Sequence, residues 1–126
     1  MAARKDSSTY SRNEKWIADC DLTYVIARIG GRWKLQILSA LEGKTLRFSD
    51  LKKTFSMMTE RMLTLQLRAL ESDGLIKRTV YAEVPARVEY ELTPVAVELW
   101  PVLDLLSAWG SKHRRLTADM TIPSHG

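Results

Sequence analysis

Hydrophobic positions recur at helical spacing in four segments of the chain's first half. The segments are 21–29, 33–41, 49–55 and 59–73. Apolar residues three or four positions apart are typical of helices that bury one face. Asp21, Ser49 and Thr59 carry side chains that cap helix N-termini, and glycines at 30–31, 43 and 74 are predicted stops. We therefore expect four helices before residue 75.

The hydrophobic period then changes from helical to two. Residues 75–81 and 87–92 alternate as strands do, with a loop over 82–86 because Pro85 cannot donate to a sheet ladder. Residues 45–48 have room only for a small strand. Thr93-Pro94 predicts the start of a last helix, which Pro101 should kink or restart.

The predicted order is helix, helix, small strand, short helix, longer helix, hairpin and helix, which is the order of a winged helix-turn-helix. The fold class is therefore α+β and mostly helical. Residues 1–13 are polar and read as a mobile arm, 14–116 as the folded domain, and 117–126 as a flexible tail. A single domain is the expected organisation at 126 residues.

The helix over 59–73 is the predicted recognition helix, because in this fold the second helix of the pair enters the major groove. At about 100° per residue, the leucines at 63, 67 and 70 share one face. The opposite face carries Arg61, Thr64, Leu65 and Arg68. Arginine can bond guanine, threonine can donate a hydrogen bond, and leucine can touch a thymine methyl. The alternative is an ordinary solvent-exposed helix.

Charge concentrates around this helix and the hairpin. The chain has 19 Lys+Arg and 15 Asp+Glu, a net charge of +4, and residues 44–87 alone hold nine basic and five acidic residues. Phosphate contacts would position the protein on DNA. We predict these contacts for Arg47, Ser49, Lys52, Lys77, Arg78 and Arg87. The acidic residues in the same segment favour an alternative, a winged-helix module that binds another protein and no specific DNA.

Five stretches of sequence carry a resemblance to a known family. They are 30–34 (GGRWK), 46–51 (LRFSDL), 61–71 (RMLTLQLRALE), 73–75 (DGL) and 81–93 (YAEVPARVEYELT). Together they resemble the HxlR-type transcriptional regulators, a bacterial branch of the MarR-like winged-helix proteins, over roughly residues 20–110. Position 65 is usually polar in that family and is leucine here, which indicates an apolar base contact.

The resemblance implies a homodimer on a two-fold-related double-stranded DNA operator, with repression as the usual mode. It also implies dimerisation through the terminal helices. Apolar residues outnumber what one side of the last helix can bury, and a second subunit would cover them. The candidate interface residues are Trp16, Ile17, Trp100, Leu103, Leu106 and Trp109. The alternative is that these residues belong to the subunit's own core.

Cys20 is the chain's one cysteine, so no disulfide can form within a subunit. It lies at the start of the first helix, where backbone N–H groups favour a thiolate, while Asp19 and Asp21 disfavour it. It matches a cysteine that several relatives use to sense oxidants or electrophiles, although proline commonly occupies the position of Asp21. The alternative is a buried structural thiol.

Other classes of function find little support in the sequence. No apolar run approaches the length of a membrane span and residues 1–15 lack a signal-peptide core, so we expect a cytoplasmic protein. His113 and His125, the only histidines, lie far along the chain from Cys20, which argues against a thiol enzyme. No metal-ligand spacing or phosphate-binding loop is present, so we expect no cofactor.

Overall fold

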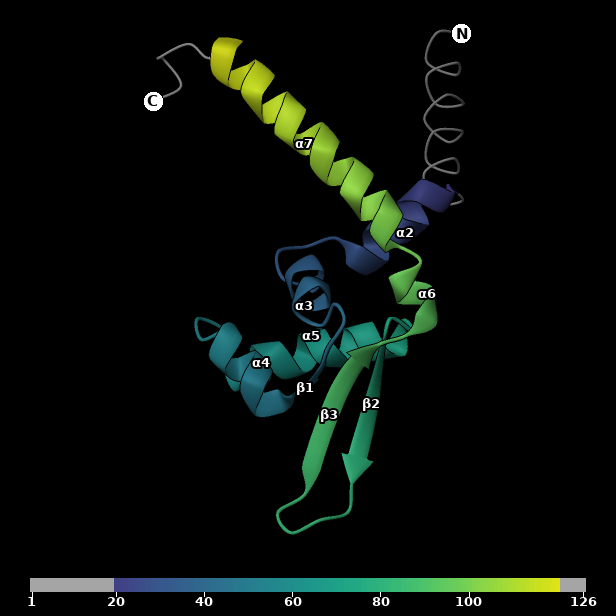
Figure 1. Cartoon of the computed structure of the whole chain (residues 1–126), viewed down its shortest axis with the longest axis vertical. Coiled ribbons are helices and arrows are strands. Elements are labelled where there is room, and N and C mark those ends of the chain that lie inside the picture. Colours follow the sequence, from purple (N-terminus) through teal and green to yellow (C-terminus); the bar gives the residue numbers. More distant parts are fainter. Residues whose placement is uncertain (1–19, 121–126) are drawn as a thin grey trace, which may run out of the picture.

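Helices α2 to α5 occupy the four segments that hydrophobic spacing predicted (Figure 1). The computed structural model describes residues 20–120. Within them α2 spans Asp21–Ile29, α3 Lys34–Ala40, α4 Phe48–Thr54 and α5 Glu60–Ser72. Thr59 caps α5 as predicted, because its Oγ1 accepts a hydrogen bond from Met62 N at 3.0 Å. Gly74 follows with φ of 74°, a left-handed conformation that glycine adopts at low cost.

Two predicted caps are wrong. The N-cap of α2 is Cys20, and Asp21 is the first helical residue. Helix α4 begins at Phe48, ahead of the predicted cap Ser49, with Arg47 as its N-cap. The Arg47 backbone N–H donates to Asp50 Oδ2 at 3.0 Å, so a carboxylate inside the helix satisfies a donor at its entry. Consequently α4 follows the preceding strand without a linker.

The strands form one antiparallel sheet in the order β1-β3-β2. Strand β1 spans Thr45–Arg47, β2 Ile76–Tyr81 and β3 Arg87–Leu92. The β2–β3 hairpin is as predicted, and Tyr81 pairs with Arg87 beside its loop. Pairing of β1 with β3 makes β3 the central strand, which the sequence pattern did not predict. The hairpin projects from the helices as the wing of a winged helix-turn-helix (Figure 1).

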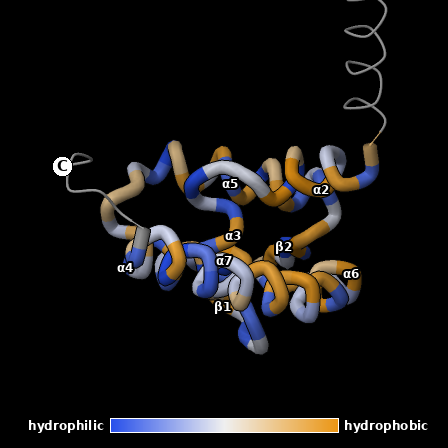
Figure 2. Tube along the Cα trace, turned by 90° about the horizontal axis from the view of Figure 1, so that it is seen from above, coloured by the Kyte–Doolittle hydropathy of each residue, from blue (hydrophilic) through white to orange (hydrophobic). Residues whose placement is uncertain are grey.

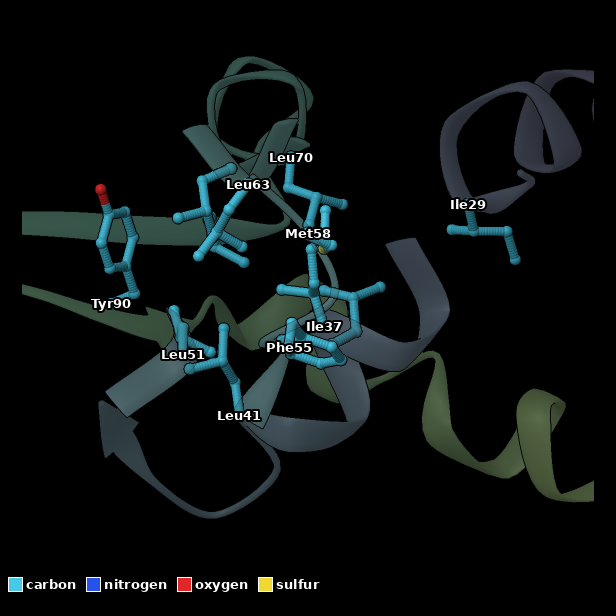
Figure 3. Close-up of a cluster of buried hydrophobic side chains, with 12 residues drawn as sticks. Ile29, Ile37, Leu41, Leu51, Phe55, Met58, Leu63, Leu70 and Tyr90 are labelled. Atoms are coloured by element: carbon cyan, nitrogen blue, oxygen red, sulfur yellow. The ribbon is translucent and has the colours of Figure 1, made fainter. Parts of the chain in front are cut away.

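The core lies between α3, α4, α5 and the inner face of the sheet (Figure 3). Leu63, Leu67 and Leu70 are all buried, which confirms the predicted packing face of α5. Burying each such side chain contributes about 1.5–3 kcal/mol relative to exposure. Trp33 packs edge-on against Phe55, with ring centroids 6.4 Å apart. Hydrophobic and hydrophilic residues are interspersed along the helices, as expected for helices that bury one face (Figure 2).

The last helical segment is interrupted just before Pro101, close to the predicted position. Helix α6 covers Pro94–Val97 with Thr93 as its N-cap, and α7 covers Trp100–Met120. At 1.5 Å per residue α7 is about 30 Å long, and it leads away from the wing (Figure 1). It continues past the expected boundary at residue 116, because residues 117–120 contain no helix breaker. The predicted arm 1–13, Trp16, Ile17 and residues 121–126 lie outside the described part.

Candidate nucleic-acid interface

The outer face of α5 presents the side chains predicted for base recognition. Arg61, Leu65 and Arg68 are exposed and Thr64 is half-buried. Leu65 is 53% exposed on this face. Helix α4 precedes α5 by one short turn, which is the helix-turn-helix arrangement. The structure therefore keeps the predicted reading residues free to meet a ligand.

Two exposed methionines lie near this face, and the sequence analysis did not predict them as surface residues. Met57, in the turn before α5, is 67% exposed, and Met62, in its first turn, is 40% exposed. At about 100° per residue, Met62 lies between the packing face and the outer face of α5. The neighbouring Met58 is buried, so the turn directs consecutive methionines to opposite environments. The outer face of α5 is consequently more apolar near the start of the helix than its predicted base-contacting residues alone would suggest.

A hollow between α5 and the wing brings two of the predicted basic residues together. It has a volume of about 240 Å³ and is lined by Thr64, Leu67, Arg68, Glu71, Arg78 and Tyr90. Arg78 faces this hollow because it pairs with the buried Tyr90 across the hairpin. Cross-strand partners share a face of the sheet. Glu71 stands in the same hollow and reduces its positive charge.

The remaining wing cations lie on the opposite face of the sheet. Lys77 is adjacent to Arg78 in the chain, and successive strand residues point to opposite faces. It pairs with Glu91, and Arg47 on β1 pairs with Glu89. The basic residues predicted to contact phosphates are therefore divided between two faces of the sheet, and on the outer face glutamates stand opposite the cations.

Arg87 is held within the wing. Its Nη2 lies 3.2 Å from Glu83 Oε2 and its Nε lies 3.2 Å from Glu89 Oε2. The guanidinium carbon lies 4.1 Å from the centroid of the Tyr81 ring. Only 27% of the side chain is exposed. Arg87 therefore differs from the free phosphate contact that its position predicted.

Helix α4 contributes the other predicted backbone contacts. Lys52 is half-buried and its Nζ donates to the Ser56 carbonyl at 3.4 Å, whereas Ser49 is exposed. Arg47 and Ser49 line a hollow of about 420 Å³ together with the wing loop. The start of α4 and the wing loop thus border one surface.

Cys20 occupies the N-cap position of α2 and is half-buried. The backbone N–H groups of Thr23 and then Leu22 lower the pKa of its thiol, because they favour the negative thiolate. Partial burial and the carboxylate of Asp21 act in the opposite direction. The net pKa is lowered, so the site favours the reactive form of the thiol.

The predicted interface residues of α7 divide into two groups. Trp100 and Leu103 are half-buried and pack against the subunit's own core. Leu106 and Trp109 are exposed, at 51% and 62%. The Trp109 ring stacks on His113 with centroids 4.9 Å apart. From Leu105 to Leu116, therefore, the large apolar side chains of α7 are exposed.

Residues 20–120 contain no cluster of three or more metal-ligating side chains. In the same range, no helix combines the length and apolar character that a membrane span requires.

Residues 28–118 match the HxlR-like helix-turn-helix family. An HTH-type transcriptional regulator from Methanothermobacter thermautotrophicus is 46% identical over 94 residues, covering 75% of this chain and 72% of its own length. The crystal structure of the HTH-type transcriptional regulator ytcD is 44% identical, with a TM-score of 0.70, and covers 75% of this chain and 97% of that one. The redox regulator HypR in its reduced form is 36% identical, with a TM-score of 0.70 and coverages of 78% and 97%.

Proposed function

Because the chain belongs to the HxlR-like helix-turn-helix family of transcriptional regulators, we propose that it represses transcription by binding a two-fold-related operator as a homodimer. The observation that carries this proposal is the division of α5 into a buried leucine face and an exposed face with Arg61, Leu65 and Arg68. A helix fixed in this way on one side can enter a major groove on the other.

In this proposal Arg61 and Arg68 hydrogen-bond base edges, Thr64 supports them, and Leu65 contacts a thymine methyl. The phosphate contacts come from Arg47, Ser49, Lys52, Lys77 and Arg78. Arg78 borders the same hollow as Arg68. A DNA strand that lies between α5 and the wing would therefore contact both side chains. Because these contacts are few and acidic residues stand among them, affinity for nonspecific DNA is modest.

The homodimer forms through α7. Its uncovered apolar side chains, Leu106 and Trp109 among them, need a cover that residues 20–120 do not supply. A second copy of the same helix is the simplest cover, since most soluble homo-oligomers are closed and symmetric. Two subunits then place two copies of α5 on one face of the duplex.

The thiol of Cys20 is the proposed switch. Its lowered pKa supports reactivity, and the similar protein HypR is named a redox regulator. With one cysteine per subunit, the products open to it are an adduct, a mixed disulfide or a bond between subunits. Loss of DNA binding on treatment with diamide or a quinone should therefore disappear in Cys20→Ser.

The central test is a DNA titration with sites selected from random duplexes. The logarithm of the association constant should fall with the logarithm of salt by about 0.9 per neutralised phosphate. Arg61→Ala or Arg68→Ala should relax preference at one base pair by about 1–3 kcal/mol. Arg114→Ala on α7 removes the same charge away from α5 and is the matched control.

Two results would contradict the proposal. One is a flat salt response, and the other is failure to enrich any sequence. Failure to select DNA together with a stable protein partner in a pull-down would favour the alternative, a winged-helix protein-interaction module. Repression itself is measured with a reporter behind the selected site, whose expression should rise when the regulator is deleted.

A further inference from the structure

We propose that Arg87 is a positioning residue of the wing, which holds Val84 at the loop tip as an apolar contact for the DNA minor groove. This proposal rests on the proposed function, since it assigns roles within the same DNA complex. It replaces the predicted phosphate contact at Arg87 with a mechanical role inside the hairpin.

The geometry around Arg87 is that of a clamp. Arg87 is the first residue of β3 and pairs with Tyr81, the last residue of β2. Its side chain bridges Glu83 in the loop and Glu89 in β3, each at 3.2 Å, and covers the Tyr81 ring. One side chain thus connects both strands and the loop between them.

A phosphate could replace these partners only at a cost. The Nε atom of Arg87 is buried, and its 3.2 Å contact with Glu89 Oε2 is an ion pair without hydrogen-bond geometry. Its charge is offset by two carboxylates, and reaching the DNA backbone would break both ion pairs. The guanidinium is therefore committed to the wing.

The loop that the clamp holds is apolar at its tip. Residues 82–86 read AEVPA, with no basic side chain, so the loop has no cation for a phosphate. Val84 is fully exposed, and the loop lies at the far end of the projecting hairpin (Figure 1). Many minor-groove proteins insert apolar side chains between base steps, and Val84 followed by Pro85 has that apolar character.

The clamp and a phosphate contact make opposite predictions for Glu89→Gln. Removing a carboxylate near DNA strengthens binding if only long-range charge matters, because repulsion of the phosphates falls. If Glu89 holds Arg87 in place, the same change weakens binding, by about fivefold for the loss of one ion pair of this exposure. The sign of the change therefore distinguishes the two roles.

The experiment measures operator affinity at several salt concentrations for wild type, Glu89→Gln, Arg87→Lys, Arg87→Met and Val84→Ala. We expect all four variants to bind about threefold to tenfold more weakly, with the salt slope unchanged. Lysine keeps the charge but cannot bridge two carboxylates and cover a ring, so it should fail to rescue. Val95→Ala, an equal truncation of an exposed valine on α6, is the control and should bind normally.

Three outcomes would overturn the proposal: tighter or unchanged binding by Glu89→Gln, a salt slope reduced by about 0.9 in Arg87→Met, or normal binding by Val84→Ala. Amide hydrogen exchange of the paired strand ends beside the loop, residues 79–81 and 87–89, in the free protein tests the clamp without DNA. Exchange should accelerate in Glu89→Gln, and unchanged exchange would refute the clamp. If wild type bound no DNA while exchange accelerated, the proposed function and the Val84 contact would fail and the clamp would stand.

Discussion

Thr93 Oγ1 donates a hydrogen bond to the Gly74 carbonyl oxygen at 2.7 Å and so joins the start of α6 to the end of α5. The same hydroxyl accepts from Ala96 N at 3.4 Å, and the Thr93 backbone N–H donates to the Leu75 carbonyl. This one side chain links the helix-turn-helix to the segment that leads into α7. The wing, whose strands begin and end here, is anchored at the same point.

Thr93→Ala should lower the free energy of unfolding by about 1–2 kcal/mol, because it removes a helix cap and leaves the Gly74 carbonyl without its partner. Chemical denaturation followed by circular dichroism measures the change. Thr93→Ser keeps the hydroxyl and is the control, with a loss well below that of alanine. Equal losses in the two variants would show that the hydroxyl is not the stabilising group.

Leu63 and Leu65 test the division of α5 into two faces. Leu63 is fully buried and Leu65 is 53% exposed. Leu63→Ala should therefore cost about 2–5 kcal/mol of stability, whereas Leu65→Ala should stay within about 0.5 kcal/mol. The measurement is again denaturant unfolding, on the same helix with the same substitution.

Leu65→Ala, which has little effect on stability, should have a clear effect on DNA binding. Leu65→Ala should weaken binding to an operator that contains thymine at the contacted position, and replacing that thymine by uracil should weaken wild type to a similar degree. The uracil effect should be absent in Leu65→Ala. A uracil effect that persists in the variant would assign the methyl contact to another side chain. Met62, which is exposed in the first turn of α5, is the next candidate.

The sequence predicted the helices and the two faces of α5 because these depend on local periodicity. Leu63, Leu67 and Leu70 recur at helical spacing, and their burial confirms the interpretation. Thr59 and Gly74 likewise act through their immediate neighbours. Local chemistry was sufficient for these elements.

The wing was harder to predict because its electrostatics depend on cross-strand register. Lys77 and Arg78 are adjacent in the chain but lie on opposite faces of the sheet. The pairing of β1 with β3 brings Arg47 opposite Glu89, a residue far along the chain. A list of basic residues cannot show these relationships, so the sequence did not reveal that the predicted phosphate contacts lie on two faces of the sheet.

The exposed apolar side of α7 predicts the oligomeric state. Leu106→Glu places a charge among the uncovered side chains and should convert a dimer into monomers in analytical ultracentrifugation, since burying an unpaired charge at an interface is costly. Ser111→Glu introduces the same charge on the side of α7 away from Leu105, Leu106 and Trp109, and it is the control. Monomeric wild type, or dimers in both variants, would refute an interface at Leu106.

Cys20 should titrate at a lower pH than an ordinary thiol. The thiolate is the nucleophile, so the alkylation rate of wild type by iodoacetamide should rise with pH and reach half its maximum at a pH below the ordinary pKa of a cysteine thiol. The backbone N–H groups of Thr23 and Leu22 are the cause, because they favour the negative form. Cys20→Ser gives the background, since the chain has one cysteine.

Asp21 supplies the control for that titration, because its carboxylate raises the pKa of the Cys20 thiol. Asp21→Asn removes this opposing charge, and the midpoint of the alkylation profile should move further down. Disruption of the α2 N-terminus by Thr23→Pro should move the midpoint up, since proline has no N–H to offer the thiolate. A wild-type midpoint at or above the usual cysteine value would mean that burial and Asp21 outweigh the backbone, and the thiol would then lack the reactivity that a sensor requires.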